Sequence, residues 1–172
     1  YFIRHFNELD SDENYIIAPQ AQSKFYIAPK MKHIGACWLT KENTKKETNN
    51  VINYFNEIFA NENIPSSCNL ILLGFSQGVS VITRFIAKSG IKFNKLIVYA
   101  GKIPTELSKN DFKHIDNKSK VYLVYCANDL YIDEKTVNLE KKKAKNLFNN
   151  ISTINFDIAH EINASIVNQL PV

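Results

Sequence analysis

A serine stands between two glycines where an apolar run ends, in the sequence ILLGFSQGVSVI (residues 71–82). This Gly-x-Ser-x-Gly pattern, centred on Ser76, is typical of a serine held on a sharp turn between a strand and a helix. We expect glycine at positions 74 and 78 because side chains there would collide where strand and helix converge. The alternative is a serine that only caps a helix. The flanking strand and helix patterns favour a nucleophile that attacks a carbonyl carbon.

A serine nucleophile needs a general base, and histidine is the usual one. Of the four histidines, His160 directly follows the last apolar run, in NFDIAHEI, and precedes a final helical pattern. His5 and His114 fall in polar surroundings, so we expect both at the surface. His33 lies in an irregular stretch, and a position at the rim of the site stays open for it. We predict His160 as the base.

A carboxylate that orients the histidine completes this chemistry. Asp129 follows the apolar run VYLVYC and lies clear of its end, so it is the predicted partner. Asp133 lies one helical turn further on, Asp157 falls within the last predicted strand, and Asp111 and Asp116 lie in a polar loop. An Asx turn is the alternative role for Asp129, because aspartate often closes such turns.

The elements that must position these residues can be read from hydrophobic periodicity. Apolar runs predict buried strands at 69–73, 95–101, 120–126 and 151–158, and helical spacing predicts helices at 44–60, 80–88, 133–148 and 161–170. Continuous apolar strands that alternate with helices indicate a parallel sheet covered on both faces. Ligand sites in such sheets gather at the carboxyl ends of the strands, which is where the serine, aspartate and histidine fall.

The N-terminal part of the chain is less regular. Tyr1, Phe2, Phe6 and Leu9 share one helical face, which predicts an amphipathic helix that is already under way at the first residue. A short apolar run at 15–19 ends at a proline, and residues 20–38 are predicted to be irregular. We therefore expect the natural chain to start before Tyr1.

Composition limits the class of protein. A chain of 172 residues with 45% hydrophobic residues fits one domain, and no apolar run approaches the ~20 residues of a membrane span. The net charge of +4 is modest, and the basic cluster EKKKAK at 140–145 lies in a helical pattern, so we predict a solvated helix face and no nucleic-acid partner.

Cysteine usage points to a reducing compartment. Cys37, Cys68 and Cys126 are scattered and odd in number, which argues against both a disulfide framework and a structural zinc site. We expect three free thiols and a cytoplasmic protein.

The segments LGFSQG, YCANDLYI and AHEI, in that order, resemble the carboxylesterase/phospholipase family of α/β-hydrolases, which includes acyl-protein thioesterases. The segments IIAPQA and YAGKIP add to the likeness. The resemblance implies an α/β-hydrolase fold, mostly parallel with helices on both faces, over a single domain at 1–172 that is N-terminally incomplete. It also implies a serine esterase that needs no metal or organic cofactor.

The sequence departs from the family pattern at two small residues and at its start. Cys126 and Ala159 stand where the family usually has glycine, and neither replacement removes a catalytic group. The family's His-Gly loop, which supplies one N–H of the oxyanion hole, would precede Tyr1. The other donor is expected to be the backbone N–H of Gln77.

The expected reaction is hydrolysis of a carboxylic ester or thioester through an acyl-enzyme. Trp38, Ile103, Leu130 and Ile132 border the predicted strand ends and are candidates for the substrate-binding wall, although each could equally be core. An acyl-protein thioesterase or a lysophospholipase shares this chemistry. A non-catalytic binding protein that keeps the fold is the alternative from another class.

Overall fold

Four parallel strands form the central sheet of the computed structural model, which describes residues 2–172. The strands lie side by side in the order β3 (Ile71–Phe75), β4 (Lys95–Tyr99), β5 (Lys120–Cys126) and β6 (Ile151–Phe156). Their register aligns Phe75 with Tyr99 and Tyr99 with Val124, so the carboxyl ends of β3, β4 and β5 meet at one edge. The four strands predicted from apolar runs are confirmed.

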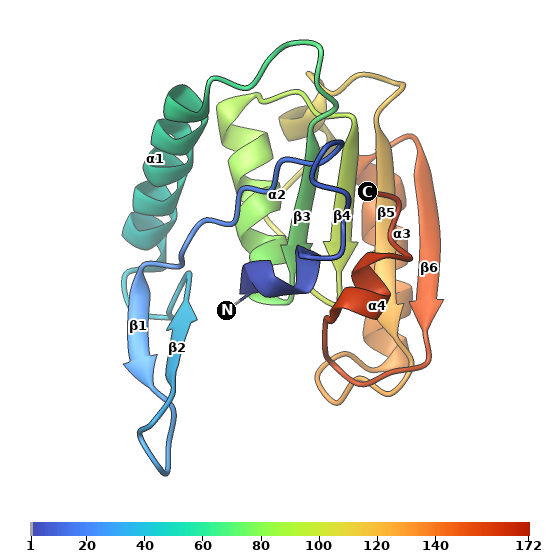
Figure 1. Cartoon of the computed structure of the whole chain (residues 1–172). Helices are drawn as coiled ribbons and strands as arrows, with labels where there is room; N and C mark the ends of the chain where they lie inside the picture. Colours follow the sequence, from blue (N-terminus) through green and yellow to red (C-terminus); the bar gives the residue numbers. More distant parts are fainter. Residues whose placement is uncertain (1) are drawn as a thin grey trace.

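Helices cover both faces of this sheet, as the sequence predicts (Figure 1). On one face lie α1 (Thr44–Glu62), α2 (Gln77–Ser89) and α3 (Glu134–Leu147), together with the short 3₁₀ helix η2 (Lys109–Phe112). The other face carries α4 (Ala164–Val167) and the 3₁₀ helix η1 (Phe2–Phe6). Strands that follow one another in both sequence and space require crossovers of one hand, which puts α2 and α3 on the same face.

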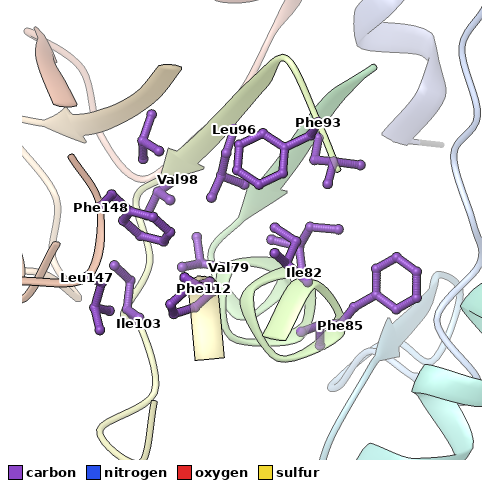
Figure 2. Close-up of a cluster of buried hydrophobic side chains, with 14 of the residues drawn as sticks. Val79, Ile82, Phe85, Phe93, Leu96, Val98, Ile103, Phe112, Leu147 and Phe148 are labelled. Atoms are coloured by element: carbon purple, nitrogen blue, oxygen red, sulfur yellow. The ribbon is translucent and has the colours of Figure 1, made fainter. Parts of the chain in front are cut away.

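Alternating side chains of β4 supply both cores. Leu96 and Val98 point toward α2 and α3, whereas Ile97 and Tyr99 point toward α4. The larger core is rich in aromatic rings (Figure 2). Phe85 of α2 is 1% exposed, and its ring contacts Phe55 with centroids 5.2 Å apart. Truncation of such a side chain to alanine typically destabilises a protein by about 3–5 kcal/mol, so this core fixes the position of α2.

The N-terminal predictions need correction. The amphipathic helix predicted from the first residue is a five-residue 3₁₀ helix, η1, and Tyr1 lies outside the described residues. The stretch predicted to be irregular contains an antiparallel hairpin, β1 (Ser23–Tyr26) and β2 (Ile34–Cys37). Its strands have four residues each, and three of the four side chains of β1 are exposed, so the stretch is too short and too little buried to show a strand pattern in the sequence.

Two smaller boundaries also differ from prediction. The closing helix has only four residues, Ala164–Val167, and Asp157 follows β6 rather than lying within it. No helix within residues 2–172 is long and apolar enough to span a membrane.

Candidate active site

Ser76 occupies the turn between β3, which ends at Phe75, and α2, which begins at Gln77. Its backbone has φ 54° and ψ −120°, an unusual conformation for a residue with a side chain. Such a conformation costs about 1–3 kcal/mol and persists where surrounding bonds impose it. Here the Ser76 N–H donates to the Tyr99 carbonyl at 2.9 Å, and the Ser76 carbonyl accepts from the Val79 N–H at 3.1 Å.

Two glycines make room for this turn. Gly74 was expected to do so from the sequence, whereas Gly101 was not. A Cβ on Gly74 would lie 2.6 Å from the Gly78 carbonyl oxygen, so β3 and α2 touch through backbone. A Cβ on Gly78 would meet nothing within 4 Å, so the predicted collision at that position is wrong. The second tight position is Gly101, where a Cβ would overlap the Ser76 carbonyl oxygen. The sequence marked Gly101 only as the end of an apolar run.

The imidazole of His160 lies between Ser76 and Asp129. Its Nε2 is 2.9 Å from Ser76 Oγ, and its Nδ1 is 2.7 Å from Asp129 Oδ2. The His160 side chain is 15% exposed and that of Asp129 is 1% exposed, so their contact is largely shielded from water. With a proton on Nδ1 donated to the carboxylate, Nε2 is left to accept the serine proton.

Asp129 is held from its other side by its own loop. Its Oδ1 accepts backbone N–H groups from Tyr131 at 2.7 Å and Ile132 at 3.1 Å. The carboxylate is therefore fixed by three hydrogen bonds, with one oxygen turned toward His160. The Asx turn considered as an alternative role is present as well, and it orients the carboxylate.

The other candidate carboxylates have different partners. Asp133 accepts from the Thr136 N–H and caps α3, whereas Asp157 accepts from the Asn128 side chain at 3.0 Å. Asp111 and Asp116 each accept from backbone N–H groups in their own polar loop. Each of these four carboxylates is engaged in local structure.

The remaining histidines lie elsewhere. The ring of His5 contacts Phe2 within η1, and the His33 carbonyl accepts from the Ile27 N–H in the hairpin. His114 was expected at the surface, but its Nε2 is buried and has no hydrogen-bond partner among the described residues. None of these contacts involves the serine.

Tyr99 contacts both the serine turn and the loop that carries His160. Its carbonyl accepts the Ser76 N–H, and its hydroxyl donates to the Glu161 carbonyl at 2.7 Å. Burial raises the pKa of this hydroxyl, so it stays a donor at neutral pH. Aromatic rings also flank His160, with Phe75 at 5.0 Å and Tyr131 at 4.9 Å between centroids. No sequence pattern indicates this role of Tyr99, because the residue stands in an apolar run that predicts only a buried strand.

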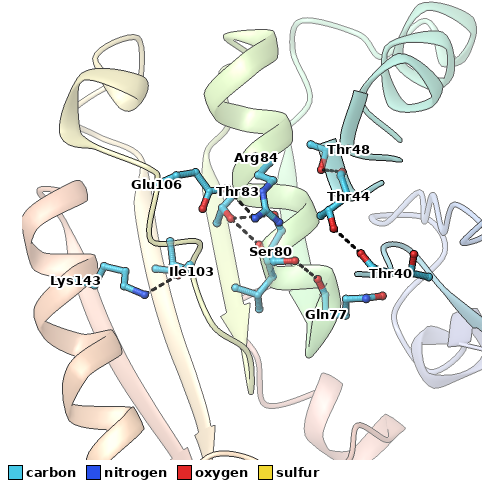
Figure 3. A network of polar contacts seen from close by, with 11 residues as sticks. Thr40, Thr44, Thr48, Gln77, Ser80, Thr83, Arg84, Ile103, Glu106 and Lys143 are labelled. Atoms are coloured by element: carbon cyan, nitrogen blue, oxygen red, sulfur yellow. Dashed lines mark hydrogen bonds and ion pairs between the residues drawn. The ribbon is translucent and has the colours of Figure 1, made fainter. Parts of the chain in front are cut away.

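The Gln77 side chain holds the segment that follows the hairpin. Its Oε1 accepts the Trp38 N–H at 2.7 Å, and its Nε2 donates to the Leu39 carbonyl at 2.6 Å. The Gln77 side chain thus forms one accepted and one donated hydrogen bond with the backbone of this segment. Figure 3 shows Gln77 at the start of α2, where its carbonyl accepts from Ser80 at 3.0 Å. The Trp38 ring packs edge-on against Phe55 in the core.

An ion pair fixes the loop that follows β4. The ion pair joins Lys143 to Glu140 at 2.7 Å, and Glu140 accepts the Ile103 N–H at 2.8 Å. Lys143 also donates to the Ile103 carbonyl at 2.6 Å (Figure 3). Glu140 is 4% exposed, so the basic cluster is not wholly the solvated face that was predicted. The loop clamped in this way carries Gly101, which lies against Ser76.

Burial separates the four residues proposed to line the substrate site. Ile103 is 1% exposed and Ile132 is 6% exposed, so both are buried, and their role in lining the substrate site stays a prediction. Leu130 is 92% exposed beside Asp129. Trp38 is partly buried against the core. Among residues 2–172, no three His, Cys, Asp or Glu side chains cluster where they could hold a metal ion.

Comparison with known proteins identifies a related family. A family model described as Phospholipase/Carboxylesterase matches residues 31–170. Esterase PE8 is similar in structure, with 15% identity and a TM-score of 0.62 over 89% of this chain and 74% of that one. Acyl-protein thioesterase 2 from Zea mays has 14% identity and a TM-score of 0.60 over 88% of this chain and 76% of that one. At these identities the structural likeness shows the fold alone.

Other solved structures are longer than this chain. The protein Atu2452 of unknown function from Agrobacterium tumefaciens str. C58 has 15% identity and a TM-score of 0.54, over 73% of this chain and 58% of that one. The chain likewise spans 64% of YahD, whose structure was determined with malic acid. It therefore covers less than two thirds of either protein. No curated protein sequence matches the chain.

Proposed function

The chain belongs to the phospholipase/carboxylesterase family, and from that premise we propose that it hydrolyses carboxylic esters or thioesters with a Ser76–His160–Asp129 triad. The observation that carries the proposal is the position of His160, whose two ring nitrogens contact the serine hydroxyl and the buried carboxylate. A nucleophile, its base and an orienting group within hydrogen-bond reach are what acyl transfer requires.

In the proposed reaction, His160 Nε2 takes the hydroxyl proton as Ser76 Oγ attacks the acyl carbonyl carbon. The carbonyl oxygen becomes an oxyanion, for which the backbone N–H of Gln77 is the proposed donor at the start of α2. Asp129 stabilises the imidazolium that forms. Return of the proton to the leaving oxygen or sulfur releases the alcohol or thiol. Water, deprotonated by His160, then cleaves the acyl-enzyme and regenerates the serine.

Exposed apolar side chains beside the triad favour an acyl group with hydrocarbon character. Leu130 is 92% exposed and Tyr131 is 75% exposed, and the Tyr131 ring stands edge-on to His160. Leaving such side chains in water is unfavourable unless something apolar covers them. The thioester of an acyl-protein or the ester of a lysophospholipid fits these exposed apolar side chains as well as a simple ester does.

The test is labelling with a fluorophosphonate probe followed by mass spectrometry. We expect the probe on Ser76, hydrolysis of nitrophenyl esters, and loss of both in Ser76→Ala. Ser80→Ala is the matched control, because Ser80 lies one helical turn further along α2 and donates only to the Gln77 carbonyl. If the wild-type chain gives the circular dichroism spectrum of a folded α/β protein but is not labelled by the probe, the proposal is wrong and the chain is a binding protein.

A further inference from the structure

The ion pair of α3 holds both peptide groups of Ile103, a buried residue of the loop after β4. Glu140 Oε2 accepts the Ile103 N–H at 2.8 Å, and Lys143 Nζ donates to the Ile103 carbonyl at 2.6 Å (Figure 3). Lys143 Nζ also donates to Glu140 Oε1 at 2.7 Å, so the three hydrogen bonds close a ring. Charge-assisted bonds on both sides of one residue fix the position and the orientation of its backbone.

This ion pair lies where charges are costly. The Glu140 side chain is 6% exposed and the Lys143 side chain is 25% exposed. The attraction within a buried pair often only offsets the cost of removing both charges from water, and apolar residues of similar size are frequently as stabilising. A pair of this kind adds little to the free energy of unfolding, so its main consequence is the fixed position of Ile103.

The loop held in this way packs against the serine turn. Gly101 lies two residues before Ile103, and a Cβ on Gly101 would overlap the Ser76 carbonyl oxygen. The same Cβ would lie 2.5 Å from Cγ2 of Val79. The Ser76 carbonyl accepts the Val79 N–H at 3.1 Å, so the loop touches both partners of this bond. A shift of the loop backbone would therefore move the turn that carries the serine.

Strained backbone lies on both sides of this contact. Ser76 has φ 54°, and Ala100, which directly precedes Gly101, has φ 46°. Residues with a side chain keep such a conformation only where their surroundings impose it. The Ala100 N–H donates to the Val124 carbonyl at 2.8 Å, so β5 holds the loop before Gly101. The bonds to Ile103 hold the loop after it.

We propose that Glu140 and Lys143 are positioning residues for the nucleophile, which hold Gly101 against Ser76 by fixing Ile103 and so keep the serine in its strained conformation. Both side chains act through the backbone of the loop. The inference rests on the proposed function, because the position of Ser76 affects the rate only if Ser76 is the nucleophile. The effect on the backbone of the serine turn requires no catalysis.

The first experiment measures hydrolysis of a short nitrophenyl ester by Glu140→Ala. Misplacement of reacting groups by 1 Å can cost about 100-fold in rate, and for a loop that is released but still packed we expect a loss of about tenfold in kcat. KM should stay within about twofold of the wild type, because neither side chain of the pair is proposed to contact substrate. The rate at which a fluorophosphonate labels Ser76 should fall with kcat. A change in KM alone would overturn the inference.

Two variants separate positioning from stability. Glu140→Met with Lys143→Met replaces the pair by apolar side chains, a change that often preserves stability. This double variant should keep a urea midpoint near that of the wild type but lose kcat as Glu140→Ala does. Val121→Ala truncates a buried side chain near the amino end of β5, so it should lower the midpoint and leave kcat unchanged. A double variant with the wild-type kcat would mean that the pair is only structural.

A conservative substitution tests the bond to Ile103 directly. Glu140→Gln removes the charge but keeps an oxygen that can accept the Ile103 N–H, so it should recover most of the rate lost in Glu140→Ala. Glu106→Gln is the matched control, because Glu106 ties the same loop to α2 through Arg84 at 2.7 Å. Its side chain is 57% exposed, and the control should hydrolyse the ester at the wild-type rate. Equal losses in Glu106→Gln and Glu140→Ala would overturn the inference.

Amide hydrogen exchange separates this inference from the proposed function. The N–H groups of Ser76 and Ala100 should exchange faster in Glu140→Ala than in the wild type, and at the wild-type rate in Glu106→Gln. If the fluorophosphonate does not label the wild type, the proposed function fails, and the exchange rates still decide whether the pair fixes the serine turn. If Ser76 is labelled but Glu140→Ala has the exchange rates and the kcat of the wild type, the proposed function stands and this inference is wrong.

Discussion

The hydroxyl of Tyr99 donates a 2.7 Å hydrogen bond to the carbonyl of Glu161, the residue directly after His160. The carbonyl of the same tyrosine accepts the N–H of Ser76. One residue of β4 thus restrains the nucleophile through its backbone and the histidine loop through its side chain. Because only the second contact depends on the side chain, a conservative substitution can release the histidine loop and leave the serine turn in place.

We predict that Tyr99→Phe slows ester hydrolysis about tenfold and lowers the free energy of unfolding by about 1–3 kcal/mol, since the Glu161 carbonyl loses its partner. The change should fall on kcat more than on KM, because the loop positions the base and not the substrate. Steady-state kinetics and urea denaturation measure the two effects. A loss of stability with unchanged kcat would reduce Tyr99 to a structural role.

Tyr125→Phe is the matched control. Tyr125 is also a buried tyrosine, on the neighbouring strand β5, but its hydroxyl has no hydrogen-bond partner among the described residues. Removing a buried unsatisfied hydroxyl should raise the free energy of unfolding by about 1 kcal/mol and leave kcat unchanged. If Tyr99→Phe lowers the free energy of unfolding and Tyr125→Phe raises it, the effect of Tyr99 depends on its contact with Glu161.

The Gln77 side chain should matter beyond its backbone N–H. In Gln77→Glu the new carboxylate can still accept from Trp38 but faces the Leu39 carbonyl, where the amide now donates at 2.6 Å. We expect slower hydrolysis at pH 7 and a lower free energy of unfolding, by about 1 kcal/mol. The loss of stability should shrink below about pH 4.3, where a protonated carboxyl regains a donor.

The control for this substitution is Gln169→Glu. Gln169 also donates its amide to a backbone carbonyl, that of Ser165, but it lies after α4 and away from the serine turn. Its hydrolysis rate should equal that of the wild type. A Gln77→Glu stability defect that does not depend on pH would mean that the hydrogen bond to Leu39 does not account for the loss.

The main sheet could be predicted because its strands are buried on both faces. Continuous apolar runs such as KVYLVYC carry that burial in the sequence, and they also show where each strand ends. Ser76, Asp129 and His160 follow three such ends, so their convergence could be anticipated from topology alone. The hairpin could not be anticipated, because its strands have only four residues each and most of their side chains are exposed.

Contacts that run through the backbone were also beyond the sequence. Gly101 and the clamp on Ile103 depend on how the loop after β4 folds back onto α2 and α3. No residue type in the sequence predicts such a contact. Ile103 illustrates the difficulty, since an isoleucine at this position fits a pocket wall or a core, and its burial to 1% exposure could not be read from the sequence.

The three cysteines should react with iodoacetamide in the order Cys68, Cys37, Cys126. Cys68 is exposed, Cys37 is partly buried and Cys126 is buried. Burial also raises the pKa of the Cys126 thiol, which lowers the fraction of reactive thiolate at neutral pH. Intact mass spectrometry over time should show one fast addition to the folded protein and three additions in denaturant. Fewer than three in denaturant without reductant would mean a disulfide.

Asp129→Asn should slow hydrolysis by about 10⁴ and leave the protein folded. The amide can still accept the Tyr131 and Ile132 N–H groups, but it can donate to His160 Nδ1 and so favour the wrong tautomer. Asp133→Asn is the control, because Asp133 caps α3 and asparagine caps helices equally well. A comparable loss of rate in the control variant would mean that the proposed partner of His160 is wrong.

Ser76 and His160 should behave as one unit, because the imidazole Nε2 lies 2.9 Å from the serine oxygen and its proposed role is to take that proton. Once Ser76→Ala has removed the hydroxyl, His160→Ala has no proton transfer left to abolish. We therefore expect the double variant to hydrolyse ester no more than about threefold more slowly than the slower single variant. Independent residues would instead multiply their losses. The measurement is kcat/KM of both single variants and the double variant, with enough enzyme to resolve turnover above the water reaction. A multiplicative loss would mean that His160 acts on the substrate through a different contact, and the mechanism built on its position between Ser76 and Asp129 would fail.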